Sequence, residues 1–409
     1  MIRGAHQLLT MRGPAEARRG AFLNDPGLIP DGSVLIRDGL VEEVGPTRRV
    51  ENLKAARDAV EISAAGRVVM PGFVDSHTHL AFPPPGWAHT DGVPALNTVK
   101  RSSAKSIANQ MRRYLRAMAR HGTTTVEVKS GCGGEPRAEL KLLRALSLVS
   151  RDPIDVVATF LLALPAPSEG PVPAEAAVEW ACAEFLPLLE RRRLARFADI
   201  EWSPVESRHR LIRRYLETAA RCGLGCRVHA DGDGPKVAAA LASDLRIAGI
   251  DHLEQIAVAD LGRRFASGPV ITLLPGQAFH TGSRQAPARA LIEAGAAVAL
   301  GSNFNRSDSP MLNMQTVVAL ACRELGMTPA EALVAATING AHAVNRTATA
   351  GSIELGKPAD LVVLSVSDYR ELGHHSGMNL VHLTMKRGEF IYQEGDVAAL
   401  AAEHLRRAW

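Results

Sequence analysis

Residues 71–80 read PGFVDSHTHL, an apolar run that ends in polar residues. This pattern is typical of a buried parallel strand that stops at a polar rim. The end of the run carries His77 and His79, and in a strand the side chains at i and i+2 point to the same side. Both imidazoles can therefore face one metal ion, although a lone His-x-His pattern is weak evidence for one.

The same kind of run recurs along the chain. Eight apolar runs end in polar residues: 68–80, 123–131, 155–164, 198–204, 225–231, 249–254, 270–276 and 296–303. Amphipathic stretches, several of which begin with Ser or Pro and end near Gly, lie between them, including 102–122, 136–150 and 173–193. Eight strand–helix units predict an α/β fold, a (β/α)8 TIM-type barrel, whose active-site residues lie at the C-terminal ends of its strands.

The two ends of the chain have a different pattern. Residues 32–46 and 351–366 alternate between apolar and polar residues and carry turn glycines, which favours antiparallel strands. We therefore expect residues 1–66 and 346–409 to build one small β-sandwich domain beside a barrel domain of residues 67–345.

Composition excludes several classes of protein. The net charge of +4 is weak for 409 residues, and aromatic residues make up only 4%, so neither a basic surface nor stacking platforms for nucleic acid are indicated. Five cysteines, an odd number at wide spacing, do not form a disulfide framework. With no signal-peptide pattern and no apolar run of about 18 residues, the expectation is a cytoplasmic protein without a membrane segment.

Two further strand ends carry a histidine, His229 after the fifth apolar run and His252 after the sixth. Four histidines at the ends of three strands predict a metal site at the mouth of the barrel. The alternative is that some of them only form hydrogen bonds in a polar rim.

With these residues in view, the chain resembles the amidohydrolase superfamily, specifically the imidazolonepropionases of histidine breakdown. The resemblance covers nearly the whole chain and depends on these motifs: PGFVDSHTHL, TTTVEVKSG, TFLLALP, HAD, DHLE, LLPG, ATINGAHAV and GSIELGKPADLVVL. It implies the same barrel with a two-ended β domain and one divalent ion, zinc or alternatively iron. Members of this family open a ring with water that the metal activates.

The resemblance also implies roles for single residues. His77, His79 and His229 match three metal ligands, and His252 matches a histidine beside the attacking water. The fourth ligand in the family is an aspartate, whereas this chain has Asn303 at that position. An asparagine offers only a neutral carbonyl oxygen and cannot accept the proton of a water molecule at ordinary pH, so the site becomes more positive.

Other departures concern proton transfer. The family places Glu or Gln three residues after the strand-five histidine as a candidate general base, and this chain has Gly232 there. Asp231 matches a different, structural role. His252 and Glu254 remain as candidate proton carriers, and the alternative for Glu254 is a structural position in the rim.

The candidate substrate-binding residues differ from the family as well. Cys132 and Leu164 replace a tyrosine and a histidine, and Phe82 to Trp87 stand where an arginine is expected. These replacements predict a more apolar, larger or aromatic substrate. Arg306, close after Asn303, is a further candidate for substrate binding.

Three interpretations follow. The first is a metal-dependent enzyme that acts on an amide or ring C–N or C–O bond of a relatively apolar small molecule, either by hydrolysis or, as a cyclase, by loss of water that closes a heterocycle. The second is an imidazolonepropionase with tolerated substitutions, and the third is a non-catalytic homologue kept for binding. A small molecule is the expected partner in the first two. A homodimer and a monomer both remain open.

Overall fold

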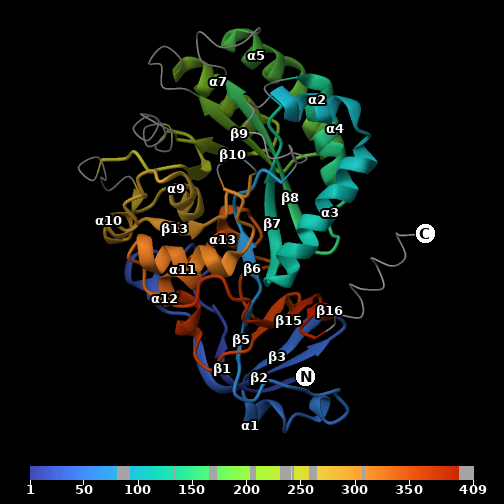
Figure 1. Cartoon of the computed structure of the whole chain (residues 1–409), viewed down its shortest axis with the longest axis vertical. Helices are drawn as coiled ribbons and strands as arrows, with labels where there is room; N and C mark the ends of the chain where they lie inside the picture. The colour runs from blue at the N-terminus through green and yellow to red at the C-terminus, as the bar shows by residue number, and fades with distance from the viewer. Residues whose placement is uncertain are drawn as a thin grey trace.

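The computed structural model describes residues 1–80, 93–132, 135–164, 173–202, 209–230, 241, 244–257, 265–305 and 309–395. Within these ranges the chain forms two eight-stranded sheets, one parallel and one mixed. Figure 1 shows the mixed sheet at one end of the molecule and the parallel sheet with its helices above it.

The parallel sheet is the predicted barrel. Along the described residues its strands pair in the order β13-β12-β11-β10-β9-β8-β7-β6. They are β6 (Phe73–Asp75), β7 (Thr123–Lys129), β8 (Asp155–Leu164), β9 (Phe197–Trp202), β10 (Gly225–His229), β11 (Ile247–Asp251), β12 (Val270–Leu273) and β13 (Ala297–Leu300). The (β/α)8 prediction is confirmed.

The helices supply the outer layer. In the described ranges they are α2 (Val93–Arg101), α3 (Ala104–Arg120), α4 (Pro136–Ser147), α5 (Ala174–Trp180), α6 (Leu186–Arg192), α7 (His209–Arg221), α9 (Pro275–Thr281), α10 (Ala288–Glu293), α11 (Met314–Glu324), α12 (Pro329–Ala335) and α13 (Ile338–Ala343). The predicted helices at 102–122 and 136–150 correspond to α3 and α4. The stretch predicted at 173–193 contains α5 and α6, joined by a π-helical turn at Ala181–Phe185.

The barrel closes at the point where the candidate site lies. Past the last paired residues of β6 and β13, the amide of Asn303 donates to the carbonyl oxygen of His77 at 2.9 Å. The amide of His79 donates to the carbonyl oxygen of Phe304, also at 2.9 Å. The segments that carry these residues are therefore held side by side by backbone hydrogen bonds.

The mixed sheet combines both ends of the chain, as predicted. It contains β1 (Ile2–Leu9), β2 (Leu28–Arg37), β3 (Leu40–Pro46), β4 (Ile62–Ser63), β5 (Val68–Pro71), β14 (Leu361–Leu364), β15 (Val381–Lys386) and β16 (Glu389–Gln393). A short helix, α1 (Thr47–Val50), follows β3. The antiparallel prediction holds for β2 with β3 and for β14 with β15, but β1 pairs in parallel with β4 and β5.

One apolar run that we expected to be a single barrel strand is divided. Residues 68–71 pair with β1 and β14 in the mixed sheet, whereas 73–75 pair with β7 in the barrel. Gly72 lies between them, where a Cβ would come within 2.2 Å of the Thr124 side chain. The chain therefore crosses from one sheet to the other at a residue without a side chain. The division into domains at residues 67 and 345 remains a proposal.

An ionic cluster fixes the barrel against the mixed sheet. Lys386 on β15 places Nζ 2.8 Å from Asp155 Oδ2 and 2.5 Å from Asp360 Oδ2, and Arg387 also bonds to Asp155. Because Asp155 is the first residue of β8, the amino end of that strand faces the mixed sheet and its carboxyl end points away from it. None of the helices in the described ranges is both long and apolar enough to cross a membrane.

Candidate metal centre

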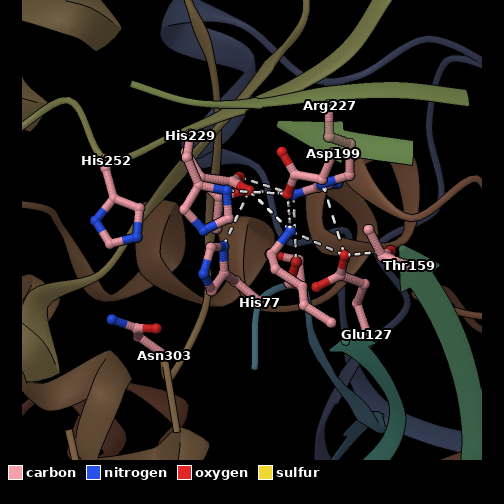
Figure 2. Close-up of polar contacts among 12 residues, drawn as sticks. His77, Glu127, Thr159, Asp199, Arg227, His229, His252 and Asn303 are labelled. Atoms are coloured by element: carbon pink, nitrogen blue, oxygen red, sulfur yellow. Dashed lines mark hydrogen bonds and ion pairs between the residues drawn. The ribbon is translucent and has the colours of Figure 1, made fainter. Parts of the chain in front are cut away.

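Four histidines converge at the carboxyl ends of the barrel strands. His77 and His79 follow β6, His229 ends β10 and His252 follows β11. The Nε2 atoms of His77 and His79 are 3.2 Å apart, and the ring centroids of His229 and His252 are 5.0 Å apart. One nitrogen from each of His77, His229 and His252 lies within 4.8 Å of the others. Figure 2 shows these three rings facing one another.

Buried carboxylates hold two of the imidazoles in place. Asp251 Oδ2 lies 3.0 Å from Nδ1 of His77, and Asp199 Oδ2 lies 3.0 Å from Nδ1 of His229. A carboxylate on one ring nitrogen fixes the ring orientation and leaves the other nitrogen for a metal. Nε2 of His229 is buried and has no hydrogen-bond partner in the described part of the chain. The residues present therefore fit a divalent ion.

A charged network lies behind the histidines. It consists of fully buried side chains from four strands: Glu127, Lys129, Asp199, Arg227 and Asp251. Lys129 Nζ is 2.6 Å from Asp199, 3.0 Å from Glu127 and 3.2 Å from Asp251. Burial alone would lower the pKa of the Lys129 ammonium, but the three carboxylates together raise it above its ordinary value. In Figure 2 three members of the network lie on the opposite side of His77 and His229 from Asn303: Glu127, Asp199 and Arg227.

The formal charges of the network do not cancel. Three carboxylates face two cations, the side chains of Lys129 and Arg227. Arg227 bonds to Asp251 at 2.7 Å. One excess negative charge therefore lies directly behind the imidazoles, where it favours a bound cation.

This network was not predicted from the sequence. Its signal was present as ionisable residues that alternate with apolar ones inside the runs VEVK, ADI, CRVH and GID. A charged residue in the interior of a buried strand requires a partner, but the sequence does not say which strand supplies it. Thr159 on β8 was missed for the same reason, and its Oγ1 donates to Glu127 at 2.5 Å.

Asn303 lies at the edge of the cluster with one end of its amide unpaired. Its Nδ2 donates to Oε1 of Gln277 at 2.7 Å, whereas Oδ1 is buried and has no hydrogen-bond partner among the described residues. The backbone of Asn303 has a φ of 49°, in the left-handed region that asparagine adopts more readily than most residues. A neutral carbonyl oxygen is thus available at the position where the family has a carboxylate.

His252 and Glu254 also lie at this end of the barrel. Nδ1 of His252 is 3.7 Å from Oε2 of Glu254, and His252 has a φ of 63°. Such backbone conformations in non-glycine residues concentrate at functional sites. The pair can exchange a proton after a small movement, because 3.7 Å exceeds a hydrogen bond only slightly.

Two of the candidate substrate-binding residues are buried. Cys132 and Leu164 are 6% and 5% exposed and belong to the same apolar cluster. The loop of Cys132 is held by the buried carboxylate of Glu139, which accepts the backbone N–H of Gly131 at 3.3 Å and that of Cys132. The other predicted positions lie outside the described residues: Phe82, Trp87, Asp231, Gly232 and Arg306.

Comparison with known sequences identifies the family. Residues 88–392 match the model of the amidohydrolase family. The chain belongs to this family. It is 39% identical to a protein named imidazolonepropionase from Symbiobacterium thermophilum, over 97% of this chain and 98% of that protein. A protein of the same name from Parabacteroides distasonis is 37% identical over 95% and 98% of the two chains. The protein is therefore an enzyme of the amidohydrolase type, in the imidazolonepropionase-like branch.

Solved structures support the same fold. An atrazine chlorohydrolase from Arthrobacter aurescens, solved in complex with zinc, aligns over 98% of both chains with a TM-score of 0.72 and 17% identity. The guanine deaminase of E. coli aligns over 96% of this chain and 99% of its own length, with a TM-score of 0.70 and 17% identity. At these identities the likeness concerns the fold alone.

Proposed function

We propose that this amidohydrolase holds one divalent ion, zinc or alternatively iron, on His77, His79 and His229. In this proposal it acts on an amide or ring C–N or C–O bond of a small molecule more apolar than imidazolonepropionate. The observation that carries the metal is the convergence of these imidazoles. Nε2 of His77 lies 3.2 Å from Nε2 of His79, and buried aspartates lie 3.0 Å from the Nδ1 atoms of His77 and His229. Such carboxylate–histidine pairs are typical of metal centres.

The ion would supply Lewis-acid polarisation of a substrate oxygen and would make a water molecule more acidic. The residues of the chain contribute positioning and proton transfer. His252 lies beside the other imidazoles and near Glu254, so we assign the transfer of protons to this pair.

Asn303 affects both the hydrogen bonding and the charge of the site. Its Oδ1 can accept a hydrogen bond from the substrate or serve as a neutral ligand, but it cannot take a proton at ordinary pH. With a divalent ion present, the ion and the buried network sum to one positive charge. This charge favours an anionic substrate group, or a substrate oxygen that is polarised during hydrolysis or during loss of water in a ring closure.

The main alternative is imidazolonepropionase activity itself, which the names of the relatives from Symbiobacterium thermophilum and Parabacteroides distasonis favour. Against it stand Leu164 and Cys132, buried apolar side chains at positions where the resemblance places a histidine and a tyrosine. A pocket with apolar walls loses the hydrogen bonds that orient a polar imidazolone and its carboxylate. The non-catalytic interpretation is disfavoured by the membership in an enzyme family.

The test combines metal analysis with a substrate screen. Purified protein should contain one divalent ion per chain. It should hydrolyse or form apolar cyclic amides and related heterocycles faster than it opens 4-imidazolone-5-propionate. A metal-free protein, or efficient turnover of imidazolonepropionate, would contradict the corresponding half of the proposal.

A further inference from the structure

The side chain of Gln277 contacts Asn303 from outside the histidine cluster. Gln277 lies in the first turn of α9, directly after β12, and its Oε1 accepts the hydrogen bond of Asn303 Nδ2 at 2.7 Å. No role for Gln277 was predicted from the sequence. The contact orients an amide whose two ends are nearly equal in size but opposite in hydrogen-bonding character.

The backbone leaves Asn303 little other freedom. Its N–H is bonded to the carbonyl oxygen of His77, and the adjacent Phe304 carbonyl accepts from His79. The side chain of Ser302, the preceding residue, donates to Asp75 at 2.6 Å. Because the backbone is fixed on both sides, the orientation of the terminal amide is the main variable that remains.

Turning the amide of Asn303 by half a turn would exchange its oxygen and nitrogen. Oδ1 would then face Oε1 of Gln277 at about hydrogen-bond distance, which places two acceptors against each other. The Nδ2 group would face the centre, where it offers two donors and no lone pair for a cation. With Gln277 in its described orientation, only the orientation with Oδ1 free keeps the hydrogen bond between the two amides.

We propose that Gln277 is a positioning residue that keeps the carbonyl oxygen of Asn303 directed at the metal centre. This inference rests on the proposed function, because it assigns the neutral oxygen to the ion on His77, His79 and His229. In this inference Gln277 has a positioning role only when residue 303 is an asparagine. A carboxylate at position 303 has acceptors at both ends, so an oxygen faces the centre in either orientation and Gln277 is not needed to orient it.

The experiment measures the affinity of metal-free protein for Zn²⁺ in competition with a chelator. Gln277→Met removes the acceptor and keeps a side chain of similar length. Since loss of a residue that orients a ligand costs about 10–100-fold in metal affinity, we expect a weakening in that range. The matched control is Gln285→Met, which removes an amide bonded to the Pro275 carbonyl at 3.4 Å and should leave the affinity unchanged.

The same substitution in an Asn303→Asp background separates orientation from general structural damage. There Gln277→Met should change the Zn²⁺ affinity by less than about twofold, because the two residues are in contact and the carboxylate removes the amide that Gln277 orients, so the two substitutions should not add. An equal loss in both backgrounds would show that Gln277 acts only on the structure and would overturn the inference. Thermal denaturation of each metal-free variant establishes that it is folded.

A second variant covers the case in which Gln277→Met does not fold. Gln277→Glu keeps acceptor oxygens at the same place, so it should bind Zn²⁺ at least as tightly as the unmodified protein. A tenfold loss there would overturn the inference. If the unmodified protein and Gln277→Met bind Zn²⁺ with equal affinity, the inference about Gln277 is wrong and the proposed function still stands. Unmodified protein without Zn²⁺ affinity would overturn both.

Discussion

Asp251 on β11 lies 3.0 Å from Nδ1 of His77 beside β6, although the two residues are far apart in the sequence. The same carboxylate bonds to Arg227 at 2.7 Å through its other oxygen. The orientation of His77 thus depends on the charged network of the barrel interior. A fixed imidazole loses little entropy when it binds a ligand, so this arrangement prepares the centre before a metal arrives.

Replacement of both His77 and His79 with Ala should remove the metal. The unmodified protein should contain one divalent ion per chain by elemental analysis, with Zn–N distances of about 2.0–2.1 Å if the ion is zinc. The double variant should contain almost none. His374 and His375, two histidines outside the cluster, provide the control double replacement. Full metal content after loss of His77 and His79 would remove the assignment.

Turnover of 4-imidazolone-5-propionate should be poor. The apolar side chains of Leu164 and Cys132 give no hydrogen bonds to its ring or carboxylate, so we expect kcat/KM below about 10⁴ M⁻¹s⁻¹, the lower end of the ordinary enzyme range. The relative from Symbiobacterium thermophilum can serve as the reference enzyme in the same assay. A value at or above that range would favour the imidazolonepropionase interpretation.

Asn303→Asp should change the reaction that the site performs. A carboxylate there adds a proton acceptor, which is worth about 10²–10⁴-fold when well placed. Hydrolysis of simple ring amides should therefore rise, while the native reaction weakens because the site loses positive charge. Initial rates on both substrate classes measure this, and a native ring closure would suffer most. If neither rate changes, position 303 does not steer the chemistry.

Lys129→Met should destabilise the fold strongly. It leaves Asp199, Glu127 and Asp251 close together with only Arg227 to compensate, and removal of one partner from a buried ion network costs about 3–5 kcal/mol. Thermal and urea denaturation measure the loss. Lys105→Met at an exposed position is the control and should differ little. An equally stable Lys129→Met protein would mean that the network is not ionised as described.

Asp155→Asn should loosen the barrel against the mixed sheet. Burial raises the pKa of the Asp155 carboxyl, but Lys386 and Arg387 outweigh burial and hold that pKa below its ordinary value. A carboxyl with a lowered pKa stabilises the folded state above its unfolded pKa of about 3.9 and loses this effect as the pH falls through the folded pKa. The variant should therefore be less stable by roughly 1–3 kcal/mol at neutral pH.

The difference between Asp155→Asn and the unmodified protein should begin to shrink below about pH 4, where the Asp155 carboxyl of the unfolded chain becomes protonated, and should vanish as the pH falls through the lower folded pKa. Denaturation midpoints at a series of pH values measure it. Asp244→Asn provides the comparison, because Asp244 pairs with Arg213 at the surface, where ion pairs contribute little. A difference that is constant down to pH 3 would exclude an electrostatic origin.

The sequence by itself determined the barrel, a β domain built from both chain ends, and the positions of the four histidines. Apolar runs that end in polar residues indicate strands and their polar ends. The positions of His77, His229 and His252 at such ends follow from the order of residues in the chain. The metal-binding and catalytic roles that the resemblance implies for those positions were also predicted from the sequence alone.

The tertiary structure alone decided which charged residues meet behind the histidines and which way Asn303 faces. Lys129, Asp199 and Asp251 come from three different strands, and each strand pattern shows that a charge needs a partner without showing where the partner lies. The division of residues 68–75 between two sheets was decided in the same way, since pairing depends on neighbours that are distant in sequence. The hydrogen bond from Asn303 to Gln277 exists because β12 and β13 pair side by side, which places the end of β13 beside the first turn of α9.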